Sequence, residues 1–289
     1  MTAHLGPNRY GKSGIRLATV DRVGDRHRFT DLEVSIRLEG DFEAAHLAGD
    51  NSAVLPTDTM RGTCYALARE GIDTVPAFAR KIAGRLLEAC PAASSAWIEV
   101  TSFPWEHVRV DGVDHPHTFR PAAGGIAVVA VTYRRDGQVN VTGGVRGLRL
   151  LKTTGSAFSG YLTDRYTTLP ETRDRIMATT VEATWGLDDP SDVEVAALAA
   201  AVPDTFAARF ATHDDSESVQ HTLHAMGTAV LDAHADVTWI HFRLPNEHHV
   251  PADLSAYGLD NPNRVFVATD RPFGVIEATV VRDGAGSGP

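Results

Sequence analysis

Lysine, threonine and aspartate side chains at two predicted element starts have the types needed to move protons and bind an anion. Lys12 follows Tyr10 and Gly11 at the head of a predicted strand, and Thr57 with Asp58 begins a predicted helix. A helix start exposes backbone N–H groups that suit an anionic ligand. The ordinary interpretations are a solvated lysine and a capping pair, and the residue types alone do not exclude them.

A second set of candidates lies in the second half of the chain. Phe158 is of a type that usually packs in a core, and Arg175 is of a type that usually forms a surface ion pair. Val219 and Gln220 fall in the first turn of a predicted amphipathic helix, where a core valine beside a solvated glutamine is the ordinary interpretation. Only a wider pattern can assign a function to these four residues.

Histidines are frequent, and they raise the hypothesis of a metal site. Among the 13, His115 and His117 are spaced to share one face of an extended segment, and His248 with His249 lies in a second such segment. A metal-dependent hydrolase using His115, His117 and His248 is therefore one alternative. No HExxH or paired CxxC spacing supports it, and no GxSxG or GxGxxG motif indicates a serine hydrolase or a dinucleotide site. The sequence predicts neither a metal nor a cofactor.

The composition is that of an ordinary globular protein. With 289 residues, of which 43% are hydrophobic and 22% charged, the chain can form one large domain or two domains. A net charge of −10 argues against nucleic acid or an anionic membrane as a partner, because both attract clustered Lys and Arg. No stretch has the apolar length of a membrane span or a signal peptide. Cys64 and Cys90 are the only cysteines, so we expect reduced core thiols in a cytoplasmic protein.

Hydrophobic patterns predict the same order of elements in both halves of the chain: strands, a pair of helices, then strands. Grouping of this kind favours an α+β fold with antiparallel sheets. Pro203 is expected to break the third predicted helix. The predicted helices start near Thr57 and Thr74 and cover 191–212 and 216–233; the predicted strands are 15–24, 28–39, 95–103, 126–133, 138–151, 176–185, 237–244 and 274–282.

Short matching segments accompany this repeated order. In the first half, Trp97-Ile98 leads to the sequence FPWEH at 103–107, and in the second half Trp239-Ile240 leads to LPNEH at 244–248. The sequence therefore indicates two tandem units of similar fold.

One long segment carries a specific family resemblance. The run at 148–175, LRLLKTTGSAFSGY followed by LTDRYTTLPETRDR, closely resembles the signature of the urate oxidase (uricase) family. The resemblance covers nearly the whole chain, from near residue 9 to about residue 282. Further blocks in the family's order are RYGK at 9–12, GDNS at 49–52, TDT at 57–59, SVQ at 218–220, LPNEH at 244–248 and DNPN at 260–263.

The resemblance implies a tunnelling fold (T-fold) repeated twice in each chain, with antiparallel sheets and paired helices that assemble into a barrel-like tunnel. The two units would cover residues 9–145 and 146–283, followed by a flexible tail at 284–289. Four chains would form a homotetramer with sites shared between subunits. Members of the family oxidise urate with dioxygen and water to 5-hydroxyisourate and hydrogen peroxide in purine degradation, without metal or flavin.

The resemblance also implies a role for each candidate residue. Lys12, Thr57 and His248 would form the catalytic proton relay, and Asn246 with Thr57 would hold dioxygen and then the attacking water. Urate is a flat purine anion, which suits an aromatic face and the planar donors of an arginine. The implied urate-binding residues are Thr57 and Asp58 from one subunit, and Phe158, Leu169, Arg175, Val219, Gln220 and Asn246.

Two positions depart from commoner family sequences. Pro56 precedes Thr57 where alanine is frequent, and Glu247 separates Asn246 from His248 where lysine is frequent. Pro56 would stiffen the chain ahead of the helix, and Glu247 would reverse a charge beside the relay. The sequence does not end in the peroxisomal Ser-Lys-Leu signal, which favours a cytoplasmic location. The alternative function is a purine- or pterin-binding T-fold protein without catalysis.

Overall fold

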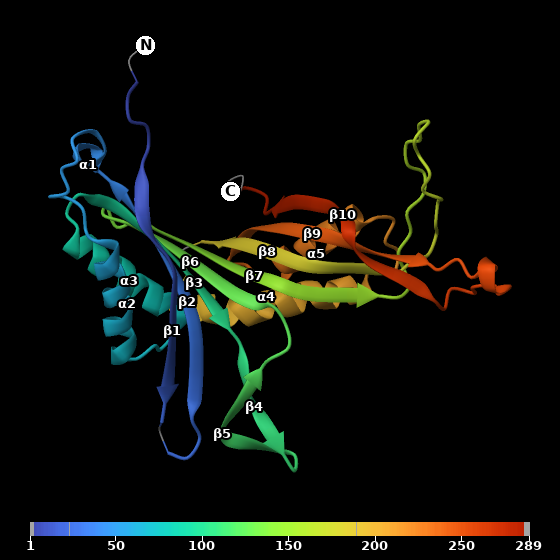
Figure 1. Ribbon diagram of the computed structural model, residues 1–289, viewed down its shortest axis with the longest axis horizontal. Helices are drawn as coiled ribbons and strands as arrows, with labels where there is room; N and C mark the ends of the chain where they lie inside the picture. Colours follow the sequence, from blue (N-terminus) through green and yellow to red (C-terminus); the bar gives the residue numbers. More distant parts are fainter. Residues whose placement is uncertain (1–2, 23, 189, 286–289) are drawn as a thin grey trace. The chain divides into compact units, whose positions relative to one another are not determined.

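The computed structural model describes residues 3–22, 24–188 and 190–285 (Figure 1). The chain divides into two compact units. The first unit comprises Met1–Gly144 and Leu187–Ala200, and the second unit comprises Val145–Gly186 and Ala201–Pro289. Strand β7 (Val139–Lys152) and helix α4 (Asp192–Thr212) therefore each contribute residues to both units.

The first unit is an antiparallel sheet with two main helices packed on it. Its strands lie in the order β1-β2-β3-β6, and a separate hairpin, β4–β5, interrupts the chain between β3 and β6. The elements are β1 (Arg9–Asp21), β2 (Arg28–Gly40), α1 (Glu43–Leu47), α2 (Thr57–Glu70), α3 (Val75–Ala89), β3 (Ala93–Phe103), β4 (Trp105–Val110), β5 (Val113–Pro121) and β6 (Ile126–Arg134).

The alternation of apolar residues along the strands and their helical spacing along the helices explain how the helices pack on the sheet. Every second residue of β2 from 32 to 38 is an apolar side chain with 1% exposure or less, which gives the strand one fully covered face. Helix α3 is capped by Thr74 and buries Phe78, Ile82 and Leu86 at helical spacing. As Figure 1 shows, α2 and α3 lie side by side; α3 packs on β3 and β6, and α2 packs on β1.

The second unit repeats the arrangement. Its strands follow the order β7-β8-β9-β10, and α5 packs on β9 and β10. The rings of Phe206 and Phe242 meet edge to face, with centroids 5.4 Å apart, in a core that also buries Trp185 and Met226. Besides β7 and α4, the elements are β8 (Met177–Leu187), α5 (Val219–Ala233), β9 (Val237–Pro251), the 3-10 helix η1 (Ser255–Tyr257) and β10 (Phe266–Val281).

An arginine closes the second helix of each unit in the same way. Arg135 and Arg282 each donate to three backbone carbonyl oxygens at the turn between that helix and the next strand. The acceptors are Leu87, Cys90 and Ala93 for Arg135, and Leu231, His234 and Val237 for Arg282. The last carbonyls of a helix lack partners within it, so both arginines satisfy groups that would otherwise be unpaired. The three acceptors have the same spacing in both units. The two units therefore share individual contacts as well as the order of their elements.

The observed architecture is α+β with antiparallel strands, as the sequence predicts. The sequence patterns did not predict α1, η1 or the β4–β5 hairpin, which are short or carry many exposed residues.

Both cysteines are buried and free, as expected. Within the described residues, no helix combines the length and apolar character that crossing a membrane requires. Residues 286–289 of the expected tail lie outside the described residues.

The expectation that Pro203 breaks a helix is wrong. Helix α4 continues through Pro203 from Asp192 to Thr212. A proline inside a helix removes one backbone hydrogen bond and costs about 3 kcal/mol. The residues next to it offset this cost, because Val202 and Phe206 are fully buried. Packing of the apolar side chains therefore keeps the helix continuous.

Gly227 in α5 provides a test of the close packing between helix and sheet. A Cβ atom at this position would lie 2.5 Å from Cγ2 of Val280 in β10, whereas a Cβ atom at Gly84 in α3 would meet nothing within 4 Å. We predict that Gly227→Ala lowers the free energy of unfolding by about 1–3 kcal/mol through overpacking. The matched variant Gly84→Ala should raise it by up to about 1 kcal/mol, since alanine is the better helix former. Urea unfolding of both variants measures this, and equal effects would contradict the packing argument.

Candidate active site

Helix α2 begins at Thr57 without a side-chain cap. Pro56 occupies the capping position with φ −58° and ψ 137°, and no described side chain accepts a hydrogen bond from the first turn as a cap. Asp58 instead forms an ion pair with Arg61, with 2.7 Å between Oδ1 and Nη2. The interpretation of Thr57 and Asp58 as a capping pair is therefore wrong. An uncapped start leaves N–H groups that suit an anionic ligand.

Strand β1, on which α2 packs, carries Lys12. Lys12 pairs with Ile36 of β2 and directly precedes a β-bulge, because the next register pair is Ile15 with Val34. Bulges of this kind re-aim side chains and occur often next to active sites. Two residues before Lys12, the hydroxyl of Tyr10 is hydrogen-bonded to the backbone of Leu55, which directly precedes Pro56. The first unit therefore ties the segment ahead of Thr57 to the strand that carries Lys12.

In the second unit, backbone hydrogen bonds bring Phe158 and Arg175 together. The backbones of Phe158 and Thr172 exchange two hydrogen bonds of 2.8 and 3.0 Å, and the N–H of Arg175 donates to the carbonyl of Ser156 at 2.8 Å. The guanidinium carbon of Arg175 lies 5.2 Å from the centroid of the Phe158 ring. An aromatic face and a planar cation are thus held next to each other.

The same segment is joined to the start of α5. The N–H of Ala157 donates to the carbonyl of Ser216 at 2.7 Å, and Oγ of Ser216 lies 2.6 Å from the hydroxyl of Thr222 in the helix. Ser218 caps α5, so that Val219 and Gln220 occupy its first turn. Val219 is buried and Gln220 is exposed. These contacts bring the predicted site residues Phe158, Arg175, Val219 and Gln220 into one region of the second unit.

The side chain of Arg175 contains a buried donor that is not hydrogen-bonded to any described residue. Its Nε atom is buried and has no hydrogen-bond partner among the described residues. Burial also lowers the pKa of the guanidinium. A buried donor without a partner costs about 1–3 kcal/mol, so an acceptor on a bound ligand would stabilise it. Arg175 therefore brings a buried, unsatisfied donor to this region of the second unit.

The loop that follows Phe158 supplies two further side chains. Tyr161 stacks on Phe158, with ring centroids 4.8 Å apart and an angle of 17° between the planes. Its hydroxyl donates to the carbonyl of Leu169 at 2.5 Å, which fixes the position of that exposed residue. Sequence reasoning named Phe158 and Leu169 but missed Tyr161. An aromatic residue three positions from Phe158 was the only available signal.

Asn246 and His248 lie on β9, where the pairing with β10 is irregular. Asn246 pairs with Gly274 and His248 with Thr269, so that four residues of β10 lie opposite Glu247 alone. Because side chains alternate along a strand, Asn246 and His248 belong to one face of β9 and Glu247 to the other. The irregular pairing therefore occurs at the two candidate residues of this strand.

Glu247 has partners that neutralise its charge. Its side chain is 13% exposed and accepts hydrogen bonds of 2.6 and 2.9 Å from Nη2 and Nε of Arg149. Its other carboxylate oxygen accepts a hydrogen bond from the hydroxyl of Thr180. The sequence predicted a reversed charge beside the relay, and the structure places a compensating arginine next to that charge.

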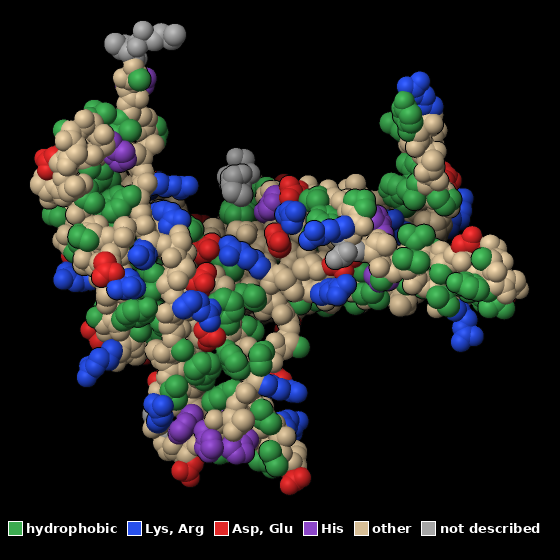
Figure 2. Space-filling view, viewed as in Figure 1, with side chains coloured by type: hydrophobic (Ala, Val, Ile, Leu, Met, Phe, Trp, Pro, Cys, Tyr) green, Lys and Arg blue, Asp and Glu red, His purple; other side chains and the backbone are tan. Residues whose placement is uncertain are grey.

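Two of the three histidines of the metal hypothesis, His115 and His117, lie on β5, and Figure 2 shows histidines gathered at the β4–β5 hairpin of the first unit. The ring centroids of His115 and His117 are 4.6 Å apart, and those of His27 and His117 are 5.8 Å apart. The Nδ1–H of His107 donates to the backbone carbonyl of His115 at 2.7 Å. His248, the third proposed ligand, belongs to the second unit.

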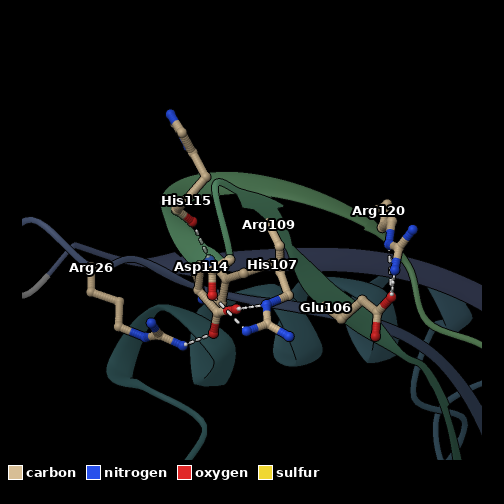
Figure 3. Close-up of polar contacts among 8 residues, drawn as sticks. Arg26, Glu106, His107, Arg109, Asp114, His115 and Arg120 are labelled. Carbon is tan, nitrogen blue, oxygen red and sulfur yellow. Dashed lines mark hydrogen bonds and ion pairs between the residues drawn. The ribbon is translucent and has the colours of Figure 1, made fainter.

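The carboxylates of this hairpin are paired with arginines (Figure 3). Asp114 contacts Arg26 at 3.0 Å and Arg109 at 3.7 Å, and these cations hold its pKa below the usual range. Glu106 pairs with Arg120 at 2.7 Å. Among the described residues, no group of three or more His, Cys, Asp or Glu side chains is placed to hold a metal ion. The metal-dependent hydrolase therefore has no structural support.

Comparisons with known proteins agree with the motifs. A family model described as Uricase matches residues 8–126 and 141–277. The chain belongs to the uricase family. It is 40% identical over 282 residues to the uricase of Arthrobacter globiformis, with 97% of this chain and 91% of that protein covered. The uricase of Arabidopsis thaliana is 36% identical over 295 residues, with 95% of this chain and 94% of the relative covered.

A solved structure extends the likeness to the fold. The crystal structure of the A. globiformis uricase matches with a TM-score of 0.93 and 38% sequence identity, covering 99% of this chain and 98% of that one. The uricase family membership thus applies to both units. Within this member, Lys12, Thr57 and Asp58 belong to the first unit, and the other predicted site residues belong to the second.

The Arg149–Glu247 pair yields a prediction for this uricase family member. We expect Glu247→Lys to lower the free energy of unfolding by about 1–3 kcal/mol, because it places like charges together at a poorly exposed position. The double variant with Arg149→Glu should recover at least half of that loss. As a matched control, Glu182→Lys at the exposed Glu182–Arg243 pair should cost less than about 1 kcal/mol. Urea unfolding of the four proteins checks this, and a double variant no more stable than Glu247→Lys would refute the pairing.

Proposed function

We propose that the chain is a urate oxidase, which converts urate, dioxygen and water to 5-hydroxyisourate and hydrogen peroxide. The observation that carries the proposal is the guanidinium of Arg175 beside the ring of Phe158, within a member of the uricase family. Urate is a flat, conjugated anion that offers ring atoms as acceptors. An aromatic face with an adjacent planar donor has the chemistry to bind it.

The second unit supplies most of the binding groups in this proposal. Phe158 stacks on the face of the purine, and Leu169 forms part of the pocket wall. Arg175 and the amide of Gln220 hold one edge of the ring, since together they provide donors and an acceptor. The backbone of Val219 binds the next edge. The hydrogen bond from the N–H of Ala157 to the carbonyl of Ser216 supports this assignment, because it holds the segment of Phe158 next to the start of α5.

The first unit supplies the groups that act on protons. The uncapped start of α2 favours an anion, so that Thr57 and Asp58 bind the remaining edge of urate. Lys12, Thr57 and His248 form the proton relay, in which Lys12 polarises the hydroxyl of Thr57 and His248 exchanges protons through water. Asn246 holds dioxygen, and later water, above the ring.

The electrons in this reaction come from the substrate. Loss of a second proton converts urate to an electron-rich dianion, which reduces dioxygen and forms a peroxide adduct at C5. Water then attacks C5, the C–O bond to the peroxide breaks, and hydrogen peroxide leaves after protonation. The balance therefore requires no redox cofactor, and the protein has only to position reactants and transfer protons.

Shared sites between copies of the chain complete the proposal. Loops of the second unit expose large apolar side chains, among them Leu162 at 98%, Tyr257 at 76% and Tyr166 at 72%. Exposed apolar groups of this size indicate association with another surface. We infer a homotetramer of T-fold units in which Lys12, Thr57 and Asp58 of one subunit meet Phe158 and Arg175 of its neighbour. A cytoplasmic location is part of the same proposal.

A urate assay under metal-chelating conditions tests the activity. We predict that the protein consumes urate and dioxygen in equal amounts and forms hydrogen peroxide, measured by urate absorbance, an oxygen electrode and a peroxidase-coupled dye. No turnover would refute the oxidase. Urate binding without peroxide would instead support the alternative, a purine-binding protein without catalysis.

Variants of the relay belong to the same test. Lys12→Met and Thr57→Ala should each lower turnover by about ten- to ten-thousand-fold, the range expected for lost acid–base catalysis, with smaller effects on urate binding. Lys81→Met, at an exposed position of α3, is the matched lysine control and should leave turnover unchanged. Unchanged turnover in both relay variants would remove Lys12 and Thr57 from the mechanism.

Mixing of inactive chains tests whether sites are shared. A Thr57→Ala chain refolded with an Arg175→Ala chain should regain up to about a quarter of wild-type activity, because each mixed pair contains one intact site. A Thr57→Ala chain mixed with a Lys12→Met chain is the control and should regain none, since both residues come from the same subunit. Mass spectrometry must confirm mixed oligomers. Without any recovery in the first mixture, the site would be built within one chain.

A further inference from the structure

Tyr10 makes two hydrogen bonds to one residue ahead of helix α2. Its hydroxyl donates to the carbonyl oxygen of Leu55 at 3.1 Å and accepts from the N–H of Leu55 at 2.9 Å. Leu55 lies in the non-helical segment before Pro56, so these backbone groups have no helix or strand to pair them. A single phenol therefore satisfies both groups of Leu55, 45 residues along the chain.

The ring of Tyr10 is itself held in place by packing. It meets the ring of Phe42 edge to face at 4.8 Å between centroids, and Phe42 is only 2% exposed. Across the sheet, Tyr10 pairs with the fully buried Leu38. The hydroxyl thus projects from a fixed ring, and its position restricts the segment to which it bonds.

The segment before the helix has a second attachment and an internal restriction. The thiol of Cys90 lies 3.6 Å from the carbonyl oxygen of Ala53, two residues before Leu55. Pro56 limits Leu55 to extended conformations and provides no N–H of its own. Leu55 lies only two positions before Thr57, so a shift of Leu55 moves the start of α2.

Tyr10 and Lys12 project from the same face of β1, because side chains alternate along a strand. On this face Tyr10 and Lys12 pair with Leu38 and Ile36 of β2, which are buried in the same core as residues of α2. Strand β1 therefore carries both the proposed relay lysine and, two residues earlier, the hydroxyl that holds the start of the helix bearing Thr57.

We propose that Tyr10 is a positioning residue, whose bonds to Leu55 keep the hydroxyl of Thr57 in register with Lys12. This inference rests on the proposed relay role of Lys12 and Thr57. Burial raises the pKa of Tyr10 to about 12, so the phenol stays protonated at neutral pH and donates and accepts at the same time. Ionisation would remove the donated bond and place a negative charge against the carbonyl of Leu55.

The first experiment removes only the hydroxyl. Tyr10→Phe keeps the ring that packs on Phe42, and it should lower kcat for urate by about tenfold to a hundredfold, the cost of a displacement near 1 Å. The urate KM should change by a smaller factor. Tyr133→Phe, at a partly buried tyrosine of the same core, is the matched control and should leave kcat unchanged. A Tyr10→Phe protein with wild-type kcat would overturn the inference.

The second experiment separates this inference from the proposed function. In a Thr57→Ala background, Tyr10→Phe should cause no further loss of kcat, because the group that it positions is already absent. An equal loss in both backgrounds would overturn the positioning role, since Tyr10 would then act on something other than Thr57. If Thr57→Ala itself leaves kcat unchanged, the relay fails, and the inference fails with it.

A third measurement applies even if Tyr10→Phe does not fold. Replacing Tyr10 by 3-fluorotyrosine keeps the shape and both hydrogen bonds but lets the phenol ionise at a lower pH. We expect the alkaline limb of the kcat profile to shift to lower pH, while urate KM in the neutral range stays as in the wild type. A fluorine NMR titration of the same protein gives the pH at which the phenol ionises, and a kcat that stays unchanged across that pH would show that the donated bond to Leu55 does not govern turnover.

Discussion

Backbone groups that no helix or strand satisfies must find another partner, and this constraint organises both units. Arg135 and Arg282 each supply three donors to the turn after a helix, so the two units close their helix pairs alike. Tyr10 satisfies the segment ahead of α2, and Ser216 accepts from the segment that bears Phe158. The loops that present the candidate site are therefore held by specific bonds and not by apolar packing alone.

Two places in the candidate site have polar groups without such a partner among the described residues. Helix α2 starts without a side-chain cap, although α3 and α5 are capped by Thr74 and Ser218. The Nε of Arg175 is buried without a partner in the described part of the chain. A folded protein keeps such groups at a cost, and a ligand that accepts hydrogen bonds recovers it. The groups at both places are donors, which agrees with an anionic substrate.

Departures from regular strand pairing accompany the residues proposed to move protons. Lys12 directly precedes a bulge in β1, and Asn246 with His248 flanks the irregular pairing between β9 and β10. A regular strand presents side chains at a fixed spacing, whereas a bulge changes the direction of a chosen side chain. Glu247 lies between Asn246 and His248 in the sequence, but its side chain belongs to the opposite face of β9. There its carboxylate is paired with Arg149 and accepts a hydrogen bond from Thr180. Glu247, which departs from the commoner lysine in the LPNEH segment, is therefore compatible with the proposed relay.

The sequence by itself determined the type and order of the main elements, because alternation and helical spacing are local patterns that each segment displays without its neighbours. Its motifs also determined the family, since they lie in the same order along nearly the whole chain. Only the tertiary structure decided that α4 continues through Pro203 and that Arg149 compensates Glu247. The hydrogen bonds from Tyr10 to Leu55 and from Ala157 to Ser216 were likewise decided only by the tertiary structure. Contacts of this kind join residues far apart in the chain or depend on competition between packing and local preference, and neither leaves a periodic trace in the sequence.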